Sequence, residues 1–237
     1  MDGSAIQRIV DLAPVQRHQV DGREYATEAL HMVAPPLVAK VPVGTLTGFS
    51  DYLAANPDGL ELAGLIVHVA SPTQVHLITA KPNVYRQRET FVTAECKPRA
   101  FPFGTYMGVE EFIIALQTYF VANSVVEQIQ ALVSSIQSEG SATYADDGVS
   151  QQVTAKTGIV AVGNVKVPNP VTLAPYRTFL EVVQPASLFV FRIRKEKDGA
   201  PACALFLADG GSWELQAITL VRDWLKGMLP EDMTILA

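Results

Sequence analysis

The order in which the hydrophobic pattern changes along this chain constrains its fold more than any single motif does. β-type apolar runs fill residues 62–96, helical spacing follows over 109–137, and short β-type runs return over 149–207. A last helical pattern covers 213–229. The chain has no regular strand–helix alternation, which argues against a doubly wound parallel sheet. We expect an α+β fold with a mostly antiparallel sheet in the C-terminal half, a central helical pair and a terminal amphipathic helix.

Two signals near the N-terminus predict an arm that precedes the main domain. Asp21-Gly22 is a strong hairpin-turn signal, and Pro35-Pro36 favours an extended backbone. We therefore expect an N-terminal helix and extended arm at 1–36 and a single α+β domain at 37–237, with a candidate internal boundary near 138–148.

Periodicity and turn residues predict the individual elements. Ser71-Pro72-Thr73-Gln74 separates two β-type runs, which favours an antiparallel hairpin. The expected helices cover 4–13, 47–55, 109–120, 124–137 and 213–229, and the expected strands cover 62–70, 75–80, 90–96, 149–155, 158–162, 165–167, 171–173, 176–183, 188–194 and 202–207.

Helix-start signals mark the central pair and the terminal helix. Glu110 and Glu111 complement the dipole of a first turn, and Ser124-Val125-Val126-Glu127 matches a capping box. The tight junction near Ala122-Asn123 fits either an αα-hairpin or one kinked helix. Ser212 is the expected N-cap of the terminal helix.

Composition and charge exclude several classes of protein. The chain is 49% hydrophobic and 18% charged, which supplies a core and excludes wholesale disorder. Its net charge is −6 and neither half is basic, so it has no bulk electrostatic signature of duplex binding. No apolar run approaches the roughly 18 residues of a membrane span, and the N-terminus lacks signal-peptide features. We expect a cytoplasmic protein without a membrane partner.

Motifs of catalysis and cofactor binding are missing from the sequence. It contains no phosphate-binding loop, no dinucleotide fingerprint and no nucleophile elbow. Cys96 and Cys203 lie far apart, outside any C-x-x-C pair, which favours buried thiols. His68 and His76 fall in the two arms of the expected hairpin, where half-exposed strand histidines are favoured over a metal pair. We expect no metal ion and no cofactor, and the pattern favours a protein that is not an enzyme.

Acidic and glycine residues supply two candidate binding loops. Asp146 and Asp147 precede an expected strand, where a turn is favoured over a binding contact. Asp209, Gly210 and Gly211 open the terminal helix, whose backbone amides can hold an anion, although a strand-to-helix turn is favoured.

Basic and aromatic residues supply a third candidate. Arg192 and Arg194 share one face of an expected strand, and Arg177 and Tyr176 lie nearby in sequence. Such a face can bind single-stranded nucleic acid or another anionic ligand. A solvated face balanced by acidic neighbours is the alternative.

Three blocks of residues resemble the YfdQ-like family of uncharacterised phage and prophage proteins. The blocks are Asp146–Thr154; Pro175–Phe179 with Glu181–Val182, Gln184–Ser187 and Phe189–Arg192; and Ala204–Phe206 with Ala208–Gly211 and Trp213. The resemblance implies an early or accessory protein of the bacterial cytoplasm and supplies no catalytic residues. Leu207 stands where the family pattern has an acidic residue, which weakens a catalytic interpretation further.

Three functional hypotheses remain open. The favoured one is a non-catalytic, self-associating interaction protein that contacts a host or phage protein. The second is an accessory of phage nucleic-acid metabolism that binds single strands. The third is an enzyme or a nucleotide-signal binder with a site at one of the acidic loops.

Overall fold

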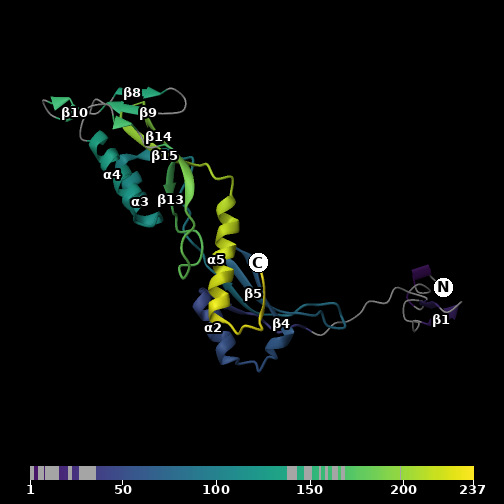
Figure 1. Ribbon diagram of the computed structural model, residues 1–237. Helices are drawn as coiled ribbons and strands as arrows, with labels where there is room; N and C mark the ends of the chain where they lie inside the picture. Colours follow the sequence, from purple (N-terminus) through teal and green to yellow (C-terminus); the bar gives the residue numbers. More distant parts are fainter. Residues whose placement is uncertain are drawn as a thin grey trace. The chain divides into compact units, whose positions relative to one another are not determined.

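The computed structural model shows an α+β fold, as the sequence predicts (Figure 1). It describes residues 3–4, 8, 16–20, 23–26, 36–137, 143–146, 151–154, 156–157, 160–161, 165–166, 169–197 and 199–237. The chain divides into a smaller unit, Met1–Leu37 with Asn83–Gln87, and a larger unit, Val38–Pro82 with Arg88–Ala237.

The smaller unit contains one hairpin. Strands β1 (Arg17–Val20) and β2 (Arg23–Ala26) pair antiparallel, which confirms the predicted hairpin. The Asp21-Gly22 turn and most of the expected helix 4–13 lie outside the described residues.

A five-stranded sheet forms one part of the larger unit. Its central strands pair antiparallel, which confirms the predicted hairpin, while both edge strands pair parallel to their neighbours. Leu62–Gly64, expected to begin a strand, forms a 3-10 turn instead. The strand order is β16 (Thr234–Leu236), β4 (Leu65–Ser71), β5 (Gln74–Thr79), β6 (Thr90–Glu95) and β3 (Val41–Val43).

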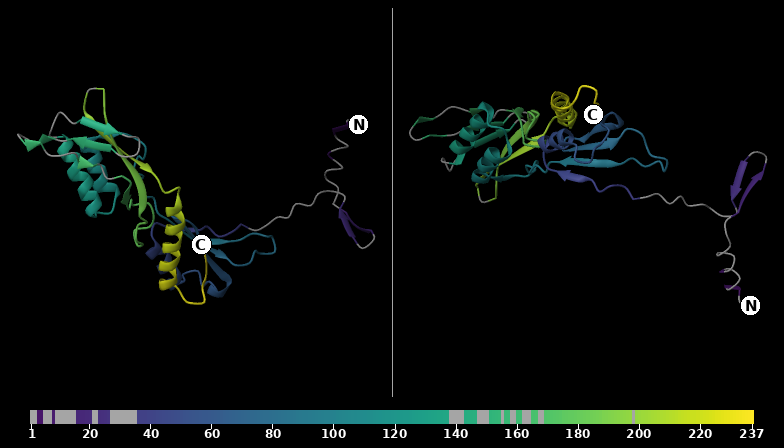
Figure 2. Two further views of the ribbon diagram at one scale, coloured as in Figure 1. Left: turned by 45° about the horizontal axis from the view of Figure 1, so that its top comes forward. Right: turned by 90° about the horizontal axis from the view of Figure 1, so that it is seen from below.

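Two helices cover one face of this sheet (Figure 2). Helix α2 (Leu46–Ala55) and helix α5 (Ser212–Met228) pack their apolar sides against the alternate strand residues that point inward. Leu53, Leu77 and Val221 belong to the resulting core. We call this cluster the first core.

A four-stranded antiparallel sheet and the central helical pair form the rest of the larger unit. Phe112 of the helix Val109–Tyr119 stacks on Phe191 of the strand Ser187–Lys195 at 5.6 Å between ring centroids, inside what we call the second core. The helices are α3 (Val109–Tyr119) and α4 (Ser124–Gln137), and the strand order is β13 (Val171–Leu173), β14 (Ser187–Lys195), β15 (Pro201–Leu207) and β7 (Met107–Gly108).

The central pair is a true helical hairpin rather than one kinked helix. Val121 N–H leaves the helix to donate to the Ala174 carbonyl at 2.9 Å, which ends α3. The predicted capping box is wrong, because Asn123 Oδ1 caps α4 by accepting from Val126 N–H at 2.9 Å.

Short strands complete the fold. They form a three-stranded sheet and a separate two-stranded pair. Among the helices that the structure describes, none is both long and apolar enough to cross a membrane. The strands are β8 (Thr143–Asp146), β9 (Gln151–Thr154) and β12 (Val165–Lys166) in the sheet, and β10 (Lys156–Thr157) with β11 (Val160–Ala161) in the pair.

Residues 176–183, expected to form a strand, are an irregular loop. The buried side chain of Gln184 bonds four backbone groups within it. Its Oε1 accepts from the Arg177 and Thr178 amides at 3.0 and 3.3 Å, and its Nε2 donates to the Phe179 and Val182 carbonyls at 2.9 and 3.3 Å. These bonds replace the ladder that a strand would need. We call residues 174–186 the connecting loop.

The connecting loop begins and ends in the second sheet but packs into the first core. Phe179 and Val182 are buried there. Thr178 Oγ1 donates to the Pro72 carbonyl. Glu181 Oε1 accepts from the Leu46 amide at 2.8 Å at the start of α2, where a carboxylate also complements the helix dipole.

The fold should lose stability on mild acidification through His76. Burial, followed by the charges of the cross-strand neighbour His68 and of Lys40, lowers the pKa of His76 below its ordinary value. Between about pH 7.5 and 5.5 the unfolded chain therefore takes up a proton that the folded chain resists. Urea unfolding at both pH values should show that the free energy of unfolding falls less on acidification in His76→Gln than in wild type. An exposed control, His18→Gln, should match wild type. Equal pH dependence in all three would contradict this assignment.

Candidate functional site

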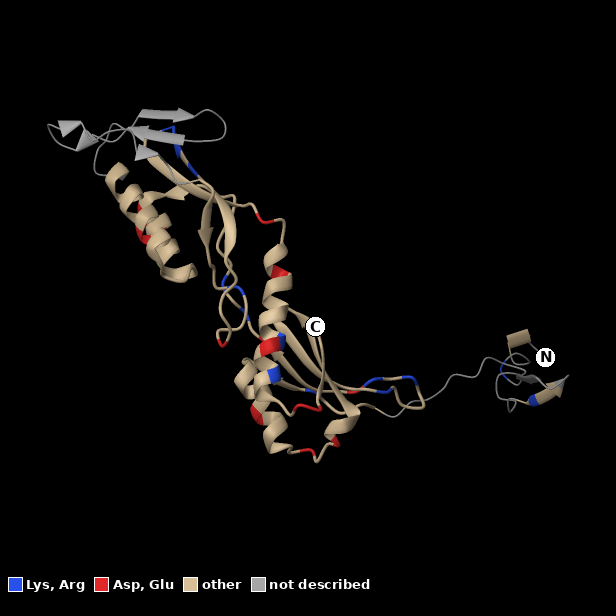
Figure 3. Cartoon of the chain, in the orientation of Figure 1, with Lys and Arg blue, Asp and Glu red and all other residues tan. Residues whose placement is uncertain are grey.

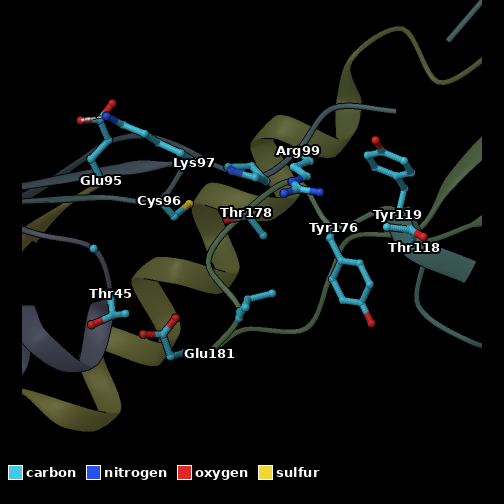
Figure 4. A pocket seen from close by; sticks show the side chains of 13 residues that line it. Thr45, Glu95, Cys96, Lys97, Arg99, Thr118, Tyr119, Tyr176, Thr178 and Glu181 are labelled. Atoms are coloured by element: carbon cyan, nitrogen blue, oxygen red, sulfur yellow. Dashed lines mark ion pairs between the residues drawn. The ribbon is translucent and has the colours of Figure 1, made fainter. Parts of the chain in front are cut away.

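A pocket of about 780 Å³ lies in the larger unit beside the connecting loop (Figure 4). This volume is typical of small-molecule sites, which span about 300–1,000 Å³. Four separate segments contribute to it: the turn before α2, the chain after β6, the end of α3 and the connecting loop. The lining residues are Gly44, Thr45, Glu95, Cys96, Lys97, Pro98, Arg99, Thr118, Tyr119, Tyr176, Thr178, Leu180 and Glu181. We call it the loop pocket.

Several polar groups of the loop pocket hold its walls in place. Thr45 Oγ1 caps α2 by accepting from the Gly48 amide at 3.0 Å. Thr118 Oγ1 donates to the Ile114 carbonyl at 2.8 Å. Thr178 and Glu181 make the contacts to the first core described above. These groups are already satisfied by the protein and give the pocket a preformed shape.

A second set of polar groups is available to a ligand. In the part of the chain that the structure describes, the Arg99 guanidinium and the hydroxyls of Tyr119 and Tyr176 have no hydrogen-bond or ion-pair partner. Tyr119 packs edge-on against Phe101 at 5.9 Å, and Tyr176 is 37% exposed. Figure 4 shows the two tyrosines and Arg99 on one side of the pocket, away from Lys97.

Lys97 has an acidic neighbour within the pocket lining. Its ammonium lies 3.9 Å from the carboxylate of Glu95, and both side chains are largely exposed to solvent. The amides at the start of α2 bind Glu181 Oε1, and among the described residues of the lining Arg99 is the cation that has no hydrogen-bond or ion-pair partner.

Cys96 lies in the pocket wall but is a poor nucleophile. Burial raises the pKa of its thiol to about 11, with smaller contributions from Glu181 and Glu95, so the thiol is protonated near neutral pH. Because the thiolate is the reactive form, the pocket has no activated sulfur.

Tyr176 is the one residue proposed from sequence that lines the loop pocket. Its neighbour Arg177 instead lies over the ring of Trp213, with 4.1 Å between the guanidinium carbon and the ring centroid. Arg177 Nη2 also donates to the Pro185 carbonyl at 3.1 Å and to Ser187 Oγ.

At the start of α5, where the sequence favours a strand-to-helix turn over an anion site, a backbone amide is bound by the protein's own carboxylate. Asp209 Oδ1 accepts from the Gly211 amide at 3.1 Å, and Asp209 Oδ2 accepts from Ser187 Oγ at 2.5 Å. Burial raises the pKa of Asp209, but these bonds and the charge of Arg177 outweigh it, so the net pKa is lowered. The N-cap of α5 is Gly211, with φ of 83°, so the prediction of Ser212 as the N-cap is wrong. Gly210 shares the positive φ, at 61°.

The remaining candidates do not join one basic surface. Arg192 and Arg194 share a face of β14, as predicted, while Arg177 bonds to Ser187, whose side chain lies on the opposite, buried face. Arg194 pairs with Glu196 and stacks on Tyr106 at 3.8 Å. Figure 3 shows lysines and arginines spread over several elements.

Asp146 and Asp147, the candidate acidic binding loop, are not among the described residues that line the loop pocket. Asp146 ends β8, and Asp147 lies outside the described residues. Among the described residues, no group of three His, Cys, Asp or Glu side chains is placed to hold a metal ion.

Comparison with protein-family models, curated proteins and solved structures gave no match. The site is therefore interpreted from its own chemistry. Sequence analysis missed Arg99 and Tyr119, which come from segments distant in sequence and belong to no local motif.

The two cysteines should differ in reactivity. Cys203 is 0% exposed and burial raises its thiol pKa to about 12, whereas Cys96 is half-buried and lines the pocket. N-ethylmaleimide should modify Cys96 slowly and Cys203 only after unfolding, as mass spectrometry of digested protein would show. Equal modification of both thiols in the native protein would contradict the pocket geometry.

Proposed function

We propose that this chain is a binding protein rather than an enzyme, and that the loop pocket takes an aromatic anion, either a free nucleotide or a segment of single-stranded nucleic acid. The observation that carries the proposal is Arg99, a cation without a partner among the described residues, beside Tyr119 and Tyr176 in a preformed pocket.

The chemistry of these three residues matches both parts of such a ligand. Aromatic side chains stack on nucleobases and contribute about 1–3 kcal/mol per base. A guanidinium presents a planar set of donors that fits two phosphate oxygens at once. Tyr176, which is partly exposed, supplies the ring, and Arg99 supplies the donors.

The other titratable groups of the pocket support binding without covalent catalysis. Cys96 is held in its protonated form, and Glu181 is committed to the first turn of α2. A catalytic cysteine needs an activated thiol, and a catalytic carboxylate must be free to reach the substrate. These two side chains meet neither requirement.

The resemblance to the YfdQ-like family supports a role as a phage or prophage accessory protein in the bacterial cytoplasm. Its second and third blocks meet in space, because Arg177 of one block lies over the ring of Trp213 of the other and Ser187 of one donates to Asp209 of the other. Their residues thus form a structural network beside the loop pocket.

Self-association stays a prediction. Leu180 and Val183 of the connecting loop are each 76% exposed, and exposed apolar side chains of this kind support contact with a second copy or another protein. Light scattering over a wide concentration range tests it, and a monomer throughout would end the idea.

Binding should require both the ring and the charge. By calorimetry, AMP should bind wild type, while adenosine and inorganic phosphate alone should bind at least about tenfold more weakly. Arg99→Gln and Tyr176→Ala should each weaken AMP binding about tenfold, because each removes one of the two contacts.

Matched controls separate the pocket from general surface effects. Lys226→Gln on the exposed side of α5 and Tyr106→Ala beside Arg194 should bind AMP as wild type does. A labelled oligothymidylate distinguishes the two sources of ligand, since tighter binding of the oligomer than of AMP indicates a nucleic-acid strand. No binding of either probe to wild type, or equal binding by all variants, would overturn the proposal.

A further inference from the structure

We infer that Arg177, Ser187, Asp209 and Trp213 act as positioning residues for the loop pocket, which couples ligand binding to the first turn of α5. None of the four lines the pocket. The inference rests on the proposed function and adds a means by which the pocket wall is set. We call these four residues the Arg177 network.

The link to the pocket is the position of Arg177 between two lining residues. Tyr176 and Thr178 both contribute to the wall, on either side of Arg177 in the chain. The amides of Arg177 and Thr178 share Gln184 Oε1 as their acceptor. A displacement of Arg177 must therefore move both neighbouring side chains.

The Arg177 side chain is held from two directions. The Pro185 carbonyl and Ser187 Oγ accept from one of its terminal nitrogens, and the ring of Trp213 lies against its face. A guanidinium over an indole face is attracted by the electron-rich face of the ring. The guanidinium is thus fixed by the start of β14 and by α5 together.

The charge balance around Arg177 supports a fixed position. Burial lowers the pKa of its guanidinium to about 10, with the charges of Asp209 and Glu214 acting in the opposite direction. The group stays charged near neutral pH. The carboxylate of Asp209 is itself oriented by Ser187 and the Gly211 amide.

Helix α5 supplies the rigid base of the network. Trp213 lies in its first turn, while Val221 and Leu225 further along are fully buried in the first core. A pocket wall anchored through Trp213 therefore responds to movement of α5, and by thermodynamic linkage a ligand in the pocket alters the surroundings of Trp213.

Arg194 provides a matched control for Arg177. Both are arginines whose guanidinium lies over an aromatic ring, at 3.8 Å for Arg194 and 4.1 Å for Arg177, but Arg194 is exposed on β14. In Arg177→Gln, hydrogen exchange of residues 174–184 should speed up about tenfold or more, whereas Arg194→Gln should leave it unchanged. Unchanged exchange in Arg177→Gln would overturn the inference without reference to any ligand.

Affinity and fluorescence test the coupling itself. AMP should bind Arg177→Gln about tenfold more weakly than wild type and Arg194→Gln equally well. In a Trp224→Phe background, saturating AMP should shift the emission of Trp213. An unshifted emission, or full affinity in Arg177→Gln, would overturn the coupling.

Two further results keep the outcomes separable. If Arg177→Gln loses its cooperative thermal transition, Trp213→Leu removes the ring and keeps the guanidinium hydrogen bonds, and the same loss of protection over 174–184 is expected. If wild type binds neither AMP nor oligothymidylate, the proposed function fails, while the exchange comparison still decides whether Arg177 sets the loop.

Discussion

The side chain of Gln184 bonds four backbone groups of a single loop, and much of the larger unit depends on those bonds. A buried amide or carbonyl without a partner costs about 1–3 kcal/mol, so the loop needs an internal source of donors and acceptors. Gln184 is 7% exposed and supplies both. Because the loop is closed in this way, Phe179 and Val182 can enter the first core although the flanking strands belong to the second sheet.

The loop pocket is a consequence of the same arrangement. Tyr176, Thr178 and Glu181 all line the pocket, and the last two bond to Pro72 and to the start of α2. These bonds satisfy the acidic and hydroxyl groups of the wall. Arg99 and the tyrosine hydroxyls then remain for a ligand, which is the basis of the proposal that the pocket binds an aromatic anion.

Elements with a clear hydrophobic period were predicted well from the sequence. The helices α2, α3, α4 and α5 and the strands β5, β6 and β14 agree with expectation to within a few residues, since each buries one regular face. Caps were predicted less well. The N-caps of α4 and α5 are Asn123 and Gly211 rather than the serines that follow them. The Asn123 side chain accepts from the Val126 amide, and Gly211 adopts a positive φ.

The connecting loop and the loop pocket could not be predicted from the sequence. Residues 176–183 resemble a strand because Phe179 and Val182 are buried, but side-chain bonds from Gln184 override the apolar pattern. Tyr176 was predicted as a binding residue, while Arg99 was not, since only the tertiary fold brings it near. Arg177 was predicted as part of a basic surface, but its guanidinium packs against the ring of Trp213 within the protein.

The central claim is that the connecting loop joins the two cores into one cooperative unit. Hydrogen-exchange mass spectrometry across a urea titration tests it most directly, with Gln184→Leu compared against Gln117→Leu on the exposed side of α3. In wild type and the control, peptides from β4–β5 and from β14–β15 should lose protection at one urea concentration. In Gln184→Leu they should lose protection at two different urea concentrations, both below the wild-type value. The expected loss of unfolding free energy is several kcal/mol, from about three backbone groups left without a partner, since the Phe179 carbonyl keeps its bond from the Val182 amide. Two separate transitions in wild type, or a single transition in Gln184→Leu at the wild-type midpoint, would contradict the account.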